Sequence, residues 1–516
     1  MSNGTVATRK SVWSLEPTSA FSSSVMLNYA KAVNVMKSRP VHDPSSWTYQ
    51  AAIHGTKAAV PAGADWNQCQ HGTWFFLPWH RMYIWFFEKI VREAMKEAGA
   101  DPTGWALPYW NYSDGPLGVV ATLPFAFRER ALPDGSPNPL YLPYPNRNEN
   151  SPNDQQQGVG LIGAGINDGG QIPPVYVSYA KAFALSNFGY PPRPDPSFAG
   201  PRTGFSHGGS QHGQLEQLPH DQVHVFTGGA SSEADCTKGW MSDPDCAAAD
   251  PIFWLHHSNI DRLWKRWLET PRMVNPTDQA WLGRQYRFYD PDSRTFVTMR
   301  PTDVLDTAAQ LGYVYDDDPA PVSLALQPSA AAVSPARAAA PGPAAVTRTE
   351  LASAGPLTLA SEATSVTGTV STPPPPTQTL LTAGPGEPQE LSLTLGNVVR
   401  EENAPIVFDV YLNLPDDQPP EPKSIYYVGH MTFFGHGHHH GTDDPTEEQA
   451  RTSFSYVITN LVQEQRAQGV WSDTSFRTTL VVGGHRDEGA PSVQGSSGAR
   501  RLAAPVHIGS VTISAE

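Results

Sequence analysis

The chain has 516 residues, of which 16% are charged and 10% aromatic, and its formal net charge is −15. The excess of acidic residues argues against a nucleic-acid partner, because such partners attract basic surfaces. No apolar run reaches the length of a membrane span, and the N-terminus shows no signal peptide, so we expect a cytoplasmic protein. A chain of this length supports a large core and is long for one domain.

The first predicted metal site lies in the N-terminal part of the chain. His54, His71 and His80 occur among aromatic residues. His80 lies near the start of an amphipathic stretch from about 78 to 98, which predicts a helix that Gly99 closes. Three neutral imidazoles suit copper, zinc, iron or nickel. A histidine on its own is more often a core or surface residue than a ligand, so the grouping carries the prediction.

A second predicted site lies further along the chain. His220 and His224 are four residues apart, so a helix presents both on one face. His257 falls in another predicted helix, from about 251 to 268, whose apolar residues recur at helical spacing. Two such sites that face each other would hold one small molecule between two metal ions.

The neighbours of His257 need separate roles. His256 and His257 are adjacent, so on a helix their side chains point about 100° apart, and we expect only one of them to bind metal. Asp261 follows His257 by one helical turn and is expected to accept a hydrogen bond from its imidazole. His42, His207 and His212 are assigned no role.

Two cysteines, Cys236 and Cys246, lie in the segment between the second-site histidines. They either form a local disulfide or remain two free thiols, and the sequence leaves both alternatives open. The third cysteine is Cys69, two residues before His71.

These segments resemble the type-3 copper family, which comprises tyrosinases, catechol oxidases (plant-type polyphenol oxidases) and molluscan haemocyanins. The resemblance is carried by SSWTYQAAIHG (45–55), HGTWFFLPWHRMYIWFFE (71–88) and DPIFWLHHSNIDRLWKRW (250–267). It continues through DQAWLGRQYRFYD (278–290), PIVFDVYLNLP (405–415) and YYVGHMTFFGHGHHHG (426–441). Apart from a linker, it therefore spans nearly the whole chain.

The resemblance implies a pair of copper ions with O2 as co-substrate. The implied ligands are His54, His71 and His80 for the first copper, and His220, His224 and His257 for the second. It also implies that Phe253 packs over the metal pair and that Cys69 forms a thioether with His71, as in fungal and molluscan relatives.

Two acidic residues carry the implied proton chemistry. Glu216 matches the acid that orients a water at the mouth of the site, and that water takes the phenol proton. Asp221 stands where efficient tyrosinases usually carry Asn, which helps to hold the water. Its extra negative charge would disfavour a phenolate.

The implied activity is oxidation of o-diphenols to o-quinones by O2, with ortho-hydroxylation of monophenols. An o-aminophenol oxidase and a haemocyanin-like dioxygen carrier are the alternatives. A zinc hydrolase is disfavoured, because no additional carboxylate or nucleophile accompanies the histidines. Small phenols are the expected partners, and the sequence leaves the oligomeric state open, a homo-oligomer included.

The expected fold class is α+β with two domains. Residues 1–318 would form a mainly α-helical dicopper domain with a four-helix bundle core, 319–346 a Pro/Ala-rich linker, and 347–516 a C-terminal β-sandwich. The resemblance implies that the β-sandwich is a lid that keeps the enzyme latent. Met431, Phe433 and Phe434 are the candidates to fill the site, and the adjacent GHGHHHG (435–441) is a candidate copper-delivery loop.

Overall fold

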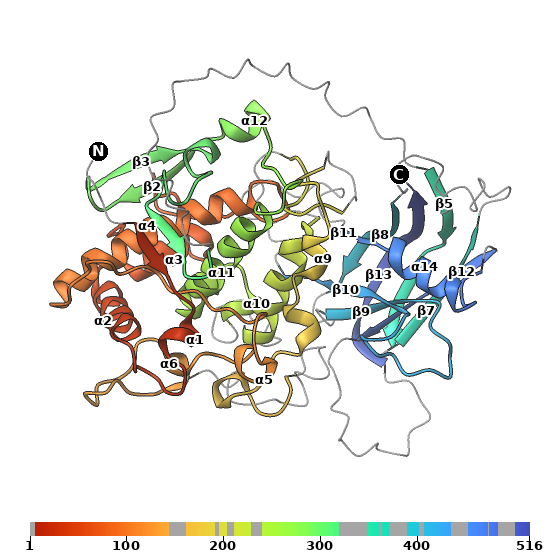
Figure 1. The fold of residues 1–516 in the computed structure, drawn as a ribbon, viewed down its shortest axis with the longest axis horizontal. Coiled ribbons are helices and arrows are strands. Elements are labelled where there is room, and N and C mark those ends of the chain that lie inside the picture. Colours follow the sequence, from red (N-terminus) through yellow and green to blue (C-terminus); the bar gives the residue numbers. More distant parts are fainter. Residues whose placement is uncertain are drawn as a thin grey trace, which may run out of the picture.

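The computed structural model describes residues 6–143, 161–190, 196–203, 211–228, 240–318, 349–361, 363–370, 390–401, 407–434, 452–472, 474–482 and 501–515. Figure 1 shows two parts: a helical domain, built from residues up to 318, and a sheet domain, built from residues 349 onward. The expected linker (319–346) lies outside the described residues.

Four longer helices form the centre of the helical domain: α2 (Ser24–Ser38), α3 (Trp47–His54), α4 (Phe76–Glu97) and α11 (Ile252–Trp267). Helix α10 (Asp221–Gly228), as long as α3 with eight residues, follows the helical turn η3 (Glu216–His220). The remaining helices and turns are α1 (Val12–Leu15), α5 (Leu117–Val120), α6 (Phe125–Arg128), η1 (Ile166–Asp168), η2 (Pro174–Val177), α9 (Ala180–Phe183), η4 (Trp240–Ser242), η5 (Ala247–Ala249), α12 (Gln279–Leu282) and η6 (Pro301–Asp303).

Helices α4 and α11 pack together through aromatic side chains. The rings of Phe87 and Trp254 stack at a centroid distance of 3.4 Å. Local sequence explains the start of α11 and the end of α4: the Asp250 carboxylate accepts a hydrogen bond from the Ile252 N–H, and Gly99, with φ +74°, follows α4. The predicted bounds, 78–98 and 251–268, therefore lie within two residues of those observed.

A buried ion cluster links the N-terminus to both helices. Asp261, on α11, accepts hydrogen bonds from Arg81 of α4, from Arg9 and from the hydroxyl groups of Tyr313 and Tyr315. Arg9 and Tyr313 belong to the short parallel pair of strands β1 (Ala7–Arg9) and β4 (Tyr313–Tyr315). The two ends of the helical domain are thus fastened to the helix that carries His257.

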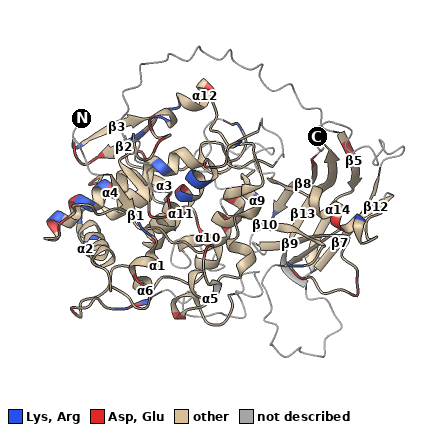
Figure 2. Cartoon of the chain, in the orientation of Figure 1, with Lys and Arg blue, Asp and Glu red and all other residues tan. Residues whose placement is uncertain are grey.

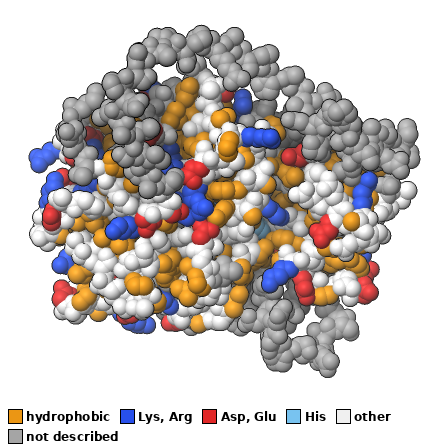
Figure 3. All heavy atoms as spheres, viewed as in Figure 1, with side chains coloured by type: hydrophobic (Ala, Val, Ile, Leu, Met, Phe, Trp, Pro, Cys, Tyr) orange, Lys and Arg blue, Asp and Glu red, His pale blue; other side chains and the backbone are white. Residues whose placement is uncertain are grey.

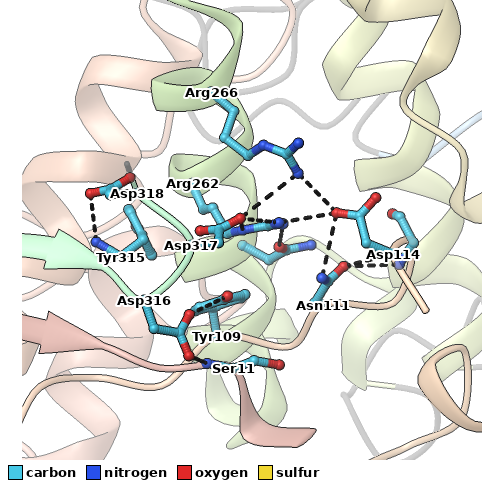
Figure 4. A network of polar contacts seen from close by, with 12 residues as sticks. Ser11, Tyr109, Asn111, Asp114, Arg262, Arg266, Tyr315, Asp316, Asp317 and Asp318 are labelled. Atoms are coloured by element: carbon cyan, nitrogen blue, oxygen red, sulfur yellow. Dashed lines mark hydrogen bonds and ion pairs between the residues drawn. The ribbon is translucent and has the colours of Figure 1, made fainter. Parts of the chain in front are cut away.

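A second polar network anchors the chain just before residue 319 (Figure 4). Arg262 donates to Asp317 and to Asp114, and Arg266 donates to Asp114. Asp316 accepts hydrogen bonds from Tyr109 and from the Ser11 N–H. The end of the helical domain is therefore held against α11.

In the described residues of the sheet domain, nine strands form one hydrogen-bonded sheet, with the order β10-β9-β12-β7-β5-β13-β8-β11 and with β6 beside β13. The strands are β5 (Thr349–Ala354), β6 (Leu357–Ser361), β7 (Ala363–Val370), β8 (Leu391–Arg400), β9 (Val407–Leu412), β10 (Tyr427–Thr432), β11 (Thr452–Val457), β12 (Ser475–Val482) and β13 (Arg501–Ala515), with one helix, α14 (Thr459–Ala467). Most of these strands carry neutral residues (Figure 2). A separate hairpin, β2 (Tyr286–Asp290) with β3 (Thr295–Met299), belongs to the helical domain.

The expected α+β division into a helical and a sheet-rich domain matches this architecture. The described strands of the sheet form one continuous ladder whose end strands, β10 and β11, contact each other. It encloses its own apolar core, which includes Leu393, Phe454 and Val511. Among the described residues, no helix is both long and apolar enough to cross a bilayer. On the face drawn in Figure 3, hydrophobic and charged side chains are interspersed.

Candidate metal centre and its cover

Six histidines from different parts of the helical domain meet between α4, α10 and α11. His54 ends α3, His80 lies in the first turns of α4, and His71 lies in the segment before α4. His220 ends η3, while His224 and His257 lie in α10 and α11. None of the six is more than 2% exposed, so the centre is enclosed.

The six rings form two groups of three that face each other. In the first group, the ring centroids of His54, His71 and His80 lie 5.2–5.6 Å apart. In the second, those of His220, His224 and His257 lie 4.6–5.5 Å apart.

The two groups touch each other. The rings of His80 and His257 stack at 4.3 Å, and those of His71 and His220 are 5.7 Å apart. Two metal ions, one in each group, would therefore be close neighbours.

One nitrogen of most rings is held by an acceptor, which turns the other nitrogen inward. The Nδ1 atoms of His54, His80 and His224 lie 2.7–2.9 Å from the backbone carbonyl oxygens of Pro244, Phe76 and Met241. The Nδ1 atom of His220 lies 2.8 Å from a carboxylate oxygen of Asp221. An acceptor at Nδ1 fixes the tautomer that leaves Nε2 available as a metal ligand.

Burial keeps these imidazoles neutral. It lowers the pKa of His80 to about 3 and holds the pKa values of His220, His224 and His257 well below their ordinary range. The neutral imidazole is the form that binds metal.

The donor set fits copper. The Nε2 atoms of His80 and His220 are buried and make no hydrogen bond within the described structure, and those of His224 and His257 lie 3.4 Å apart. Imidazole-only sites suit copper or zinc, and hard cations prefer oxygen ligands. Buried nitrogen atoms that face one another would be costly without a cation to coordinate them.

The neighbouring side chains explain how the rings are held. Phe253 lies 4.2 Å from the ring of His257 and 4.8 Å from that of His54 by centroid distance, so it packs against both groups, as expected. The sulfur of Cys69 lies 3.5 Å from Nδ1 of His71, in a fully buried position. This proximity is compatible with the expected thioether.

The acidic residues differ in part from their expected placement. Glu216 is fully buried, and its carboxylate accepts hydrogen bonds from the Gly72 N–H at 3.0 and 3.1 Å. Both oxygens of Asp221 accept from imidazoles: Oδ1 from His220, and Oδ2 from His212 at 2.9 Å. Burial raises the pKa of both carboxyl groups, and for Glu216 the charge of Asp221 adds to the effect. Asp221 therefore supports a ring rather than facing an open cavity.

The prediction for Asp261 needs correction. Its oxygens are occupied by Arg9, Arg81 and the two tyrosines described above, and Nδ1 of His257 has no hydrogen-bond partner in the described structure. Asp261 compensates two buried guanidinium charges, which attract it more strongly than a neutral imidazole does.

Two further histidines enter the centre, although sequence reasoning gave them no metal role. His256 is fully buried and stacks 5.2 Å from His220, so it joins His220, His224 and His257 in one group of close nitrogens. His212 bonds to Asp221, as described. The spacing of His212, four residues before Glu216, is the only sequence signal that could have drawn attention to it.

Among the described residues, Phe434 of the sheet domain covers the second group of histidines and also lies 5.9 Å from the ring of His71. The ring of Phe434 stacks on His224 at 4.2 Å with an interplanar angle of 17°, and it lies 5.6 Å from His220. It is 3% exposed and packs with the core of the helical domain. Met431 and Phe433 instead lie in the core of the sheet domain, where Phe433 contacts Phe454.

Buried polar groups surround this contact. The Tyr176 hydroxyl donates to Asp409 at 3.0 Å, and the Lys181 ammonium donates to the Val428 carbonyl. His430 packs against the Tyr176 ring at 5.3 Å.

Burial shifts the pKa values of all three ionisable groups. It raises the pKa of Asp409 to about 7, lowers that of Lys181 to about 8 and lowers that of His430 to about 3. The interface therefore disfavours charge on each of them.

Two expectations concern residues that the structure does not describe. Cys246 is in a disulfide, whereas Cys236, the partner considered, lies outside the described residues. The GHGHHHG loop (435–441) and His207 also lie outside them.

Family models account for most of the chain. The common central domain of tyrosinase matches residues 44–270, the polyphenol oxidase middle domain matches 275–325, and a domain of unknown function matches 348–492. The last match coincides with much of the sheet domain.

Relatives extend the match over nearly the full length. A tyrosinase from Hahella sp. is 30% identical over 491 residues, which cover 89% of this chain and 93% of that protein. A polyphenol oxidase of Malus domestica is 30% identical over 470 residues, covering 88% and 72%. Among solved structures, latent apple tyrosinase has a TM-score of 0.61 at 24% identity, covering 99% of this chain and 98% of that one. Latent aurone synthase has a TM-score of 0.60 at 19% identity, covering 100% and 90%.

These relatives contradict the expectation of a cytoplasmic protein. The polyphenol oxidases of Malus domestica, Vicia faba and Vitis vinifera and the larreatricin hydroxylase of Larrea tridentata are named chloroplastic, whereas the Hahella relative is bacterial. The absence of a visible signal peptide was too weak a basis for a compartment.

The 30% sequence identity to the Hahella tyrosinase, over 89% of this chain and 93% of that protein, establishes the family to which this chain belongs. The histidine centre fits the dicopper site of this family. The chain therefore belongs to the tyrosinase and polyphenol oxidase family of type-3 copper phenol oxidases.

Proposed function

We propose that this protein oxidises o-diphenols to o-quinones, with reduction of O2 to water, and ortho-hydroxylates monophenols. The observation that carries the proposal is the pair of facing imidazole trios, whose nitrogens converge in a buried space. Relatives named tyrosinase and polyphenol oxidase favour an enzyme over a dioxygen carrier or an o-aminophenol oxidase.

The proposed ligands of the first copper are His54, His71 and His80, and those of the second are His220, His224 and His257. When bound, the copper pair supplies the exchange of electrons between the phenol and O2. His257 is preferred over His256, because His257 also groups with His54 and His80 and so lies between the two trios. The thioether between Cys69 and His71, whose sulfur and Nδ1 atoms lie 3.5 Å apart, would fix the orientation of the His71 ring. Peptide mass spectrometry would detect it as a cross-link lacking two hydrogen atoms.

Glu216 is the proposed proton acceptor for the phenol hydroxyl, through a water. Burial and the neighbouring Asp221 raise the pKa of Glu216, and a higher pKa makes the ionised carboxylate a stronger base. Asp221 would act indirectly, by orienting His220.

Comparing Glu216→Gln with the unchanged protein on a monophenol and the matching o-diphenol tests this role. Hydroxylation requires loss of the phenol proton before oxygen transfer, so the monophenol rate should fall more. Equal losses on both substrates would show that Glu216 only shapes the site.

We further infer that the sheet domain makes the enzyme latent. The support is Phe434, which covers His224, and the latent relatives with the same overall fold. Cleavage within 319–346 followed by removal of residues 347–516 should raise the activity of the copper-loaded protein on bulky diphenols. A cleaved protein that keeps its copper and gains no activity would exclude a lid.

The finer architecture is part of the proposal. We infer that α3, α4, α10 and α11 form the four-helix bundle of the copper site, since five of the six ligands lie in or directly beside them. We also infer domain limits at 1–318 and 347–516. The family models for 44–270, 275–325 and 348–492 support a boundary in this region.

A further inference from the structure

His212 lies outside the six-histidine set, yet it is connected to it through one carboxylate. Its Nδ1 atom lies 2.9 Å from Oδ2 of Asp221, and the other oxygen of Asp221 lies 2.8 Å from Nδ1 of His220. The side chains of all three residues are 0% exposed. One buried carboxylate is thus shared by two imidazole N–H groups, one on each oxygen.

This arrangement differs from the support of the other ligand rings. His54, His80 and His224 are held by backbone carbonyls, whose positions are set by the fold. His220 is held by a side chain that can rotate. A fixed orientation of His220 therefore depends on whatever fixes Asp221.

His212 supplies that second constraint. A buried carboxylate oxygen that loses its donor is left desolvated without a hydrogen bond, which is unfavourable, so the Asp221 side chain would rotate to recover a partner. Rotation would withdraw Oδ1 from His220 and release both the tautomer and the orientation of that ring. Residues that orient a metal-bound imidazole in this way commonly change metal affinity by about 10–100-fold when replaced.

We propose that His212 is a positioning residue for the second copper site: it holds Asp221, and Asp221 holds His220. The proposal rests on the proposed function, because it requires His220 to be a copper ligand. It predicts a selective effect on one of the two metals. The ring of His212 also packs on that of His71 at 6.2 Å, but among the described hydrogen bonds Asp221 connects His212 to His220, a member of the second trio.

Two substitutions separate the hydrogen bond from the bulk of the side chain. His212→Leu removes the donor and keeps an apolar side chain in the buried space. His212→Asn keeps an N–H donor at a similar distance from the backbone. His42→Leu is the control, because His42 is an exposed histidine of the same domain.

The experiment titrates the copper-loaded full chain with a chelator and counts the copper retained. We expect His212→Leu to release one of two coppers at about 10–100-fold lower chelator concentration than the unchanged protein, and His212→Asn to restore most of the retention. His42→Leu should retain both coppers like the unchanged protein. Thermal unfolding of each metal-free variant reports whether the fold survives.

Three results would overturn the proposal. The first is copper retention in His212→Leu equal to that of the unchanged protein. The second is a His212→Asn variant that releases copper as readily as His212→Leu. The third is loss of both coppers from His212→Leu together with a lower unfolding temperature of its metal-free form. Failure of the proposed function itself looks different. In that case the unchanged protein would not bind two coppers, or His220→Ala would leave copper binding intact.

Discussion

Replacing Phe434 with Ala should release the activity of the intact chain. The ring is 3% exposed and stacks on His224 at 4.2 Å, so its loss removes a well-packed aromatic contact between the two domains. Truncation of such a side chain costs about 2–4 kcal/mol. At about 1.4 kcal/mol per factor of ten, the ratio of covered to open protein falls roughly 30- to 800-fold.

The assay compares kcat/KM of the intact and linker-cleaved proteins on a bulky o-diphenol. The linker holds the sheet domain close at high effective concentration, so only a large loss of docking energy will expose the site. The Phe434→Ala variant should approach the value of the cleaved protein, which sets the upper limit. Phe433→Leu is the matched control, since Phe433 packs in the core of the sheet domain. It should leave the intact protein latent.

A Phe434→Ala variant that stays at the activity of the intact protein while cleavage raises activity would show that Phe434 is not the cover. Another residue would then cover the copper site. Thermal unfolding of the sheet domain must be recorded for both variants. Activation that accompanies unfolding of the sheet domain would reflect loss of the whole domain rather than of one side chain.

The remaining predictions concern the interface and the buried ion cluster. Burial at the interface raises the pKa of Asp409 to about 7 and lowers that of His430 to about 3, and we expect these shifts to be lost when the domains separate. Between about pH 4 and 6.5, Asp409 is therefore protonated in the covered form and His430 is protonated in the open form. Because the two forms hold the same number of protons on this pair, latency should vary little with pH in this range. Asp409→Asn should make the chain open as pH falls below about 6.5, because only the proton taken up by His430 in the open form remains. His430→Asn should make the chain close as pH falls from about 7 to 4, because only the proton taken up by Asp409 in the covered form remains. In each variant the ratio of covered to open protein should change by up to about tenfold per pH unit, and parallel pH profiles of the two variants would disprove this. In chemical denaturation, Asp261→Asn should lower the free energy of unfolding by about 3–5 kcal/mol, because Arg9 and Arg81 lose their shared carboxylate. The control is Asp416→Asn, which removes the ion pair of Asp416 with Arg477. Because the Asp416 side chain is 84% exposed, this substitution should lower the free energy of unfolding by less than about 1 kcal/mol.

The features that the sequence predicts well depend on residues that are close together in the chain. The bounds of α4 and α11 follow from their apolar spacing and from Asp250 and Gly99 at their ends. The grouping of the histidines follows from motifs that surround them with aromatic residues. These features need no knowledge of distant parts of the chain.

What the sequence does not predict depends on contacts between distant segments. Asp261 turns away from His257 because Arg9 and Arg81 lie beside it, and these residues are 252 and 180 positions away. His212 acquires its role only because the chain folds back over Asp221. The choice of Phe434 over Phe433 depends on how the sheet domain docks, since adjacent side chains of an extended chain point to opposite sides.

The central claim is that two coppers are bound by two trios of histidines. X-ray diffraction from crystals of the copper-loaded full chain, recorded at the copper absorption edge, measures this directly. The account predicts two anomalous peaks, one within bonding distance of His54, His71 and His80 and the other of His220, His224 and His257. A single peak, or a second peak bonded to His256 in place of His257, would contradict it.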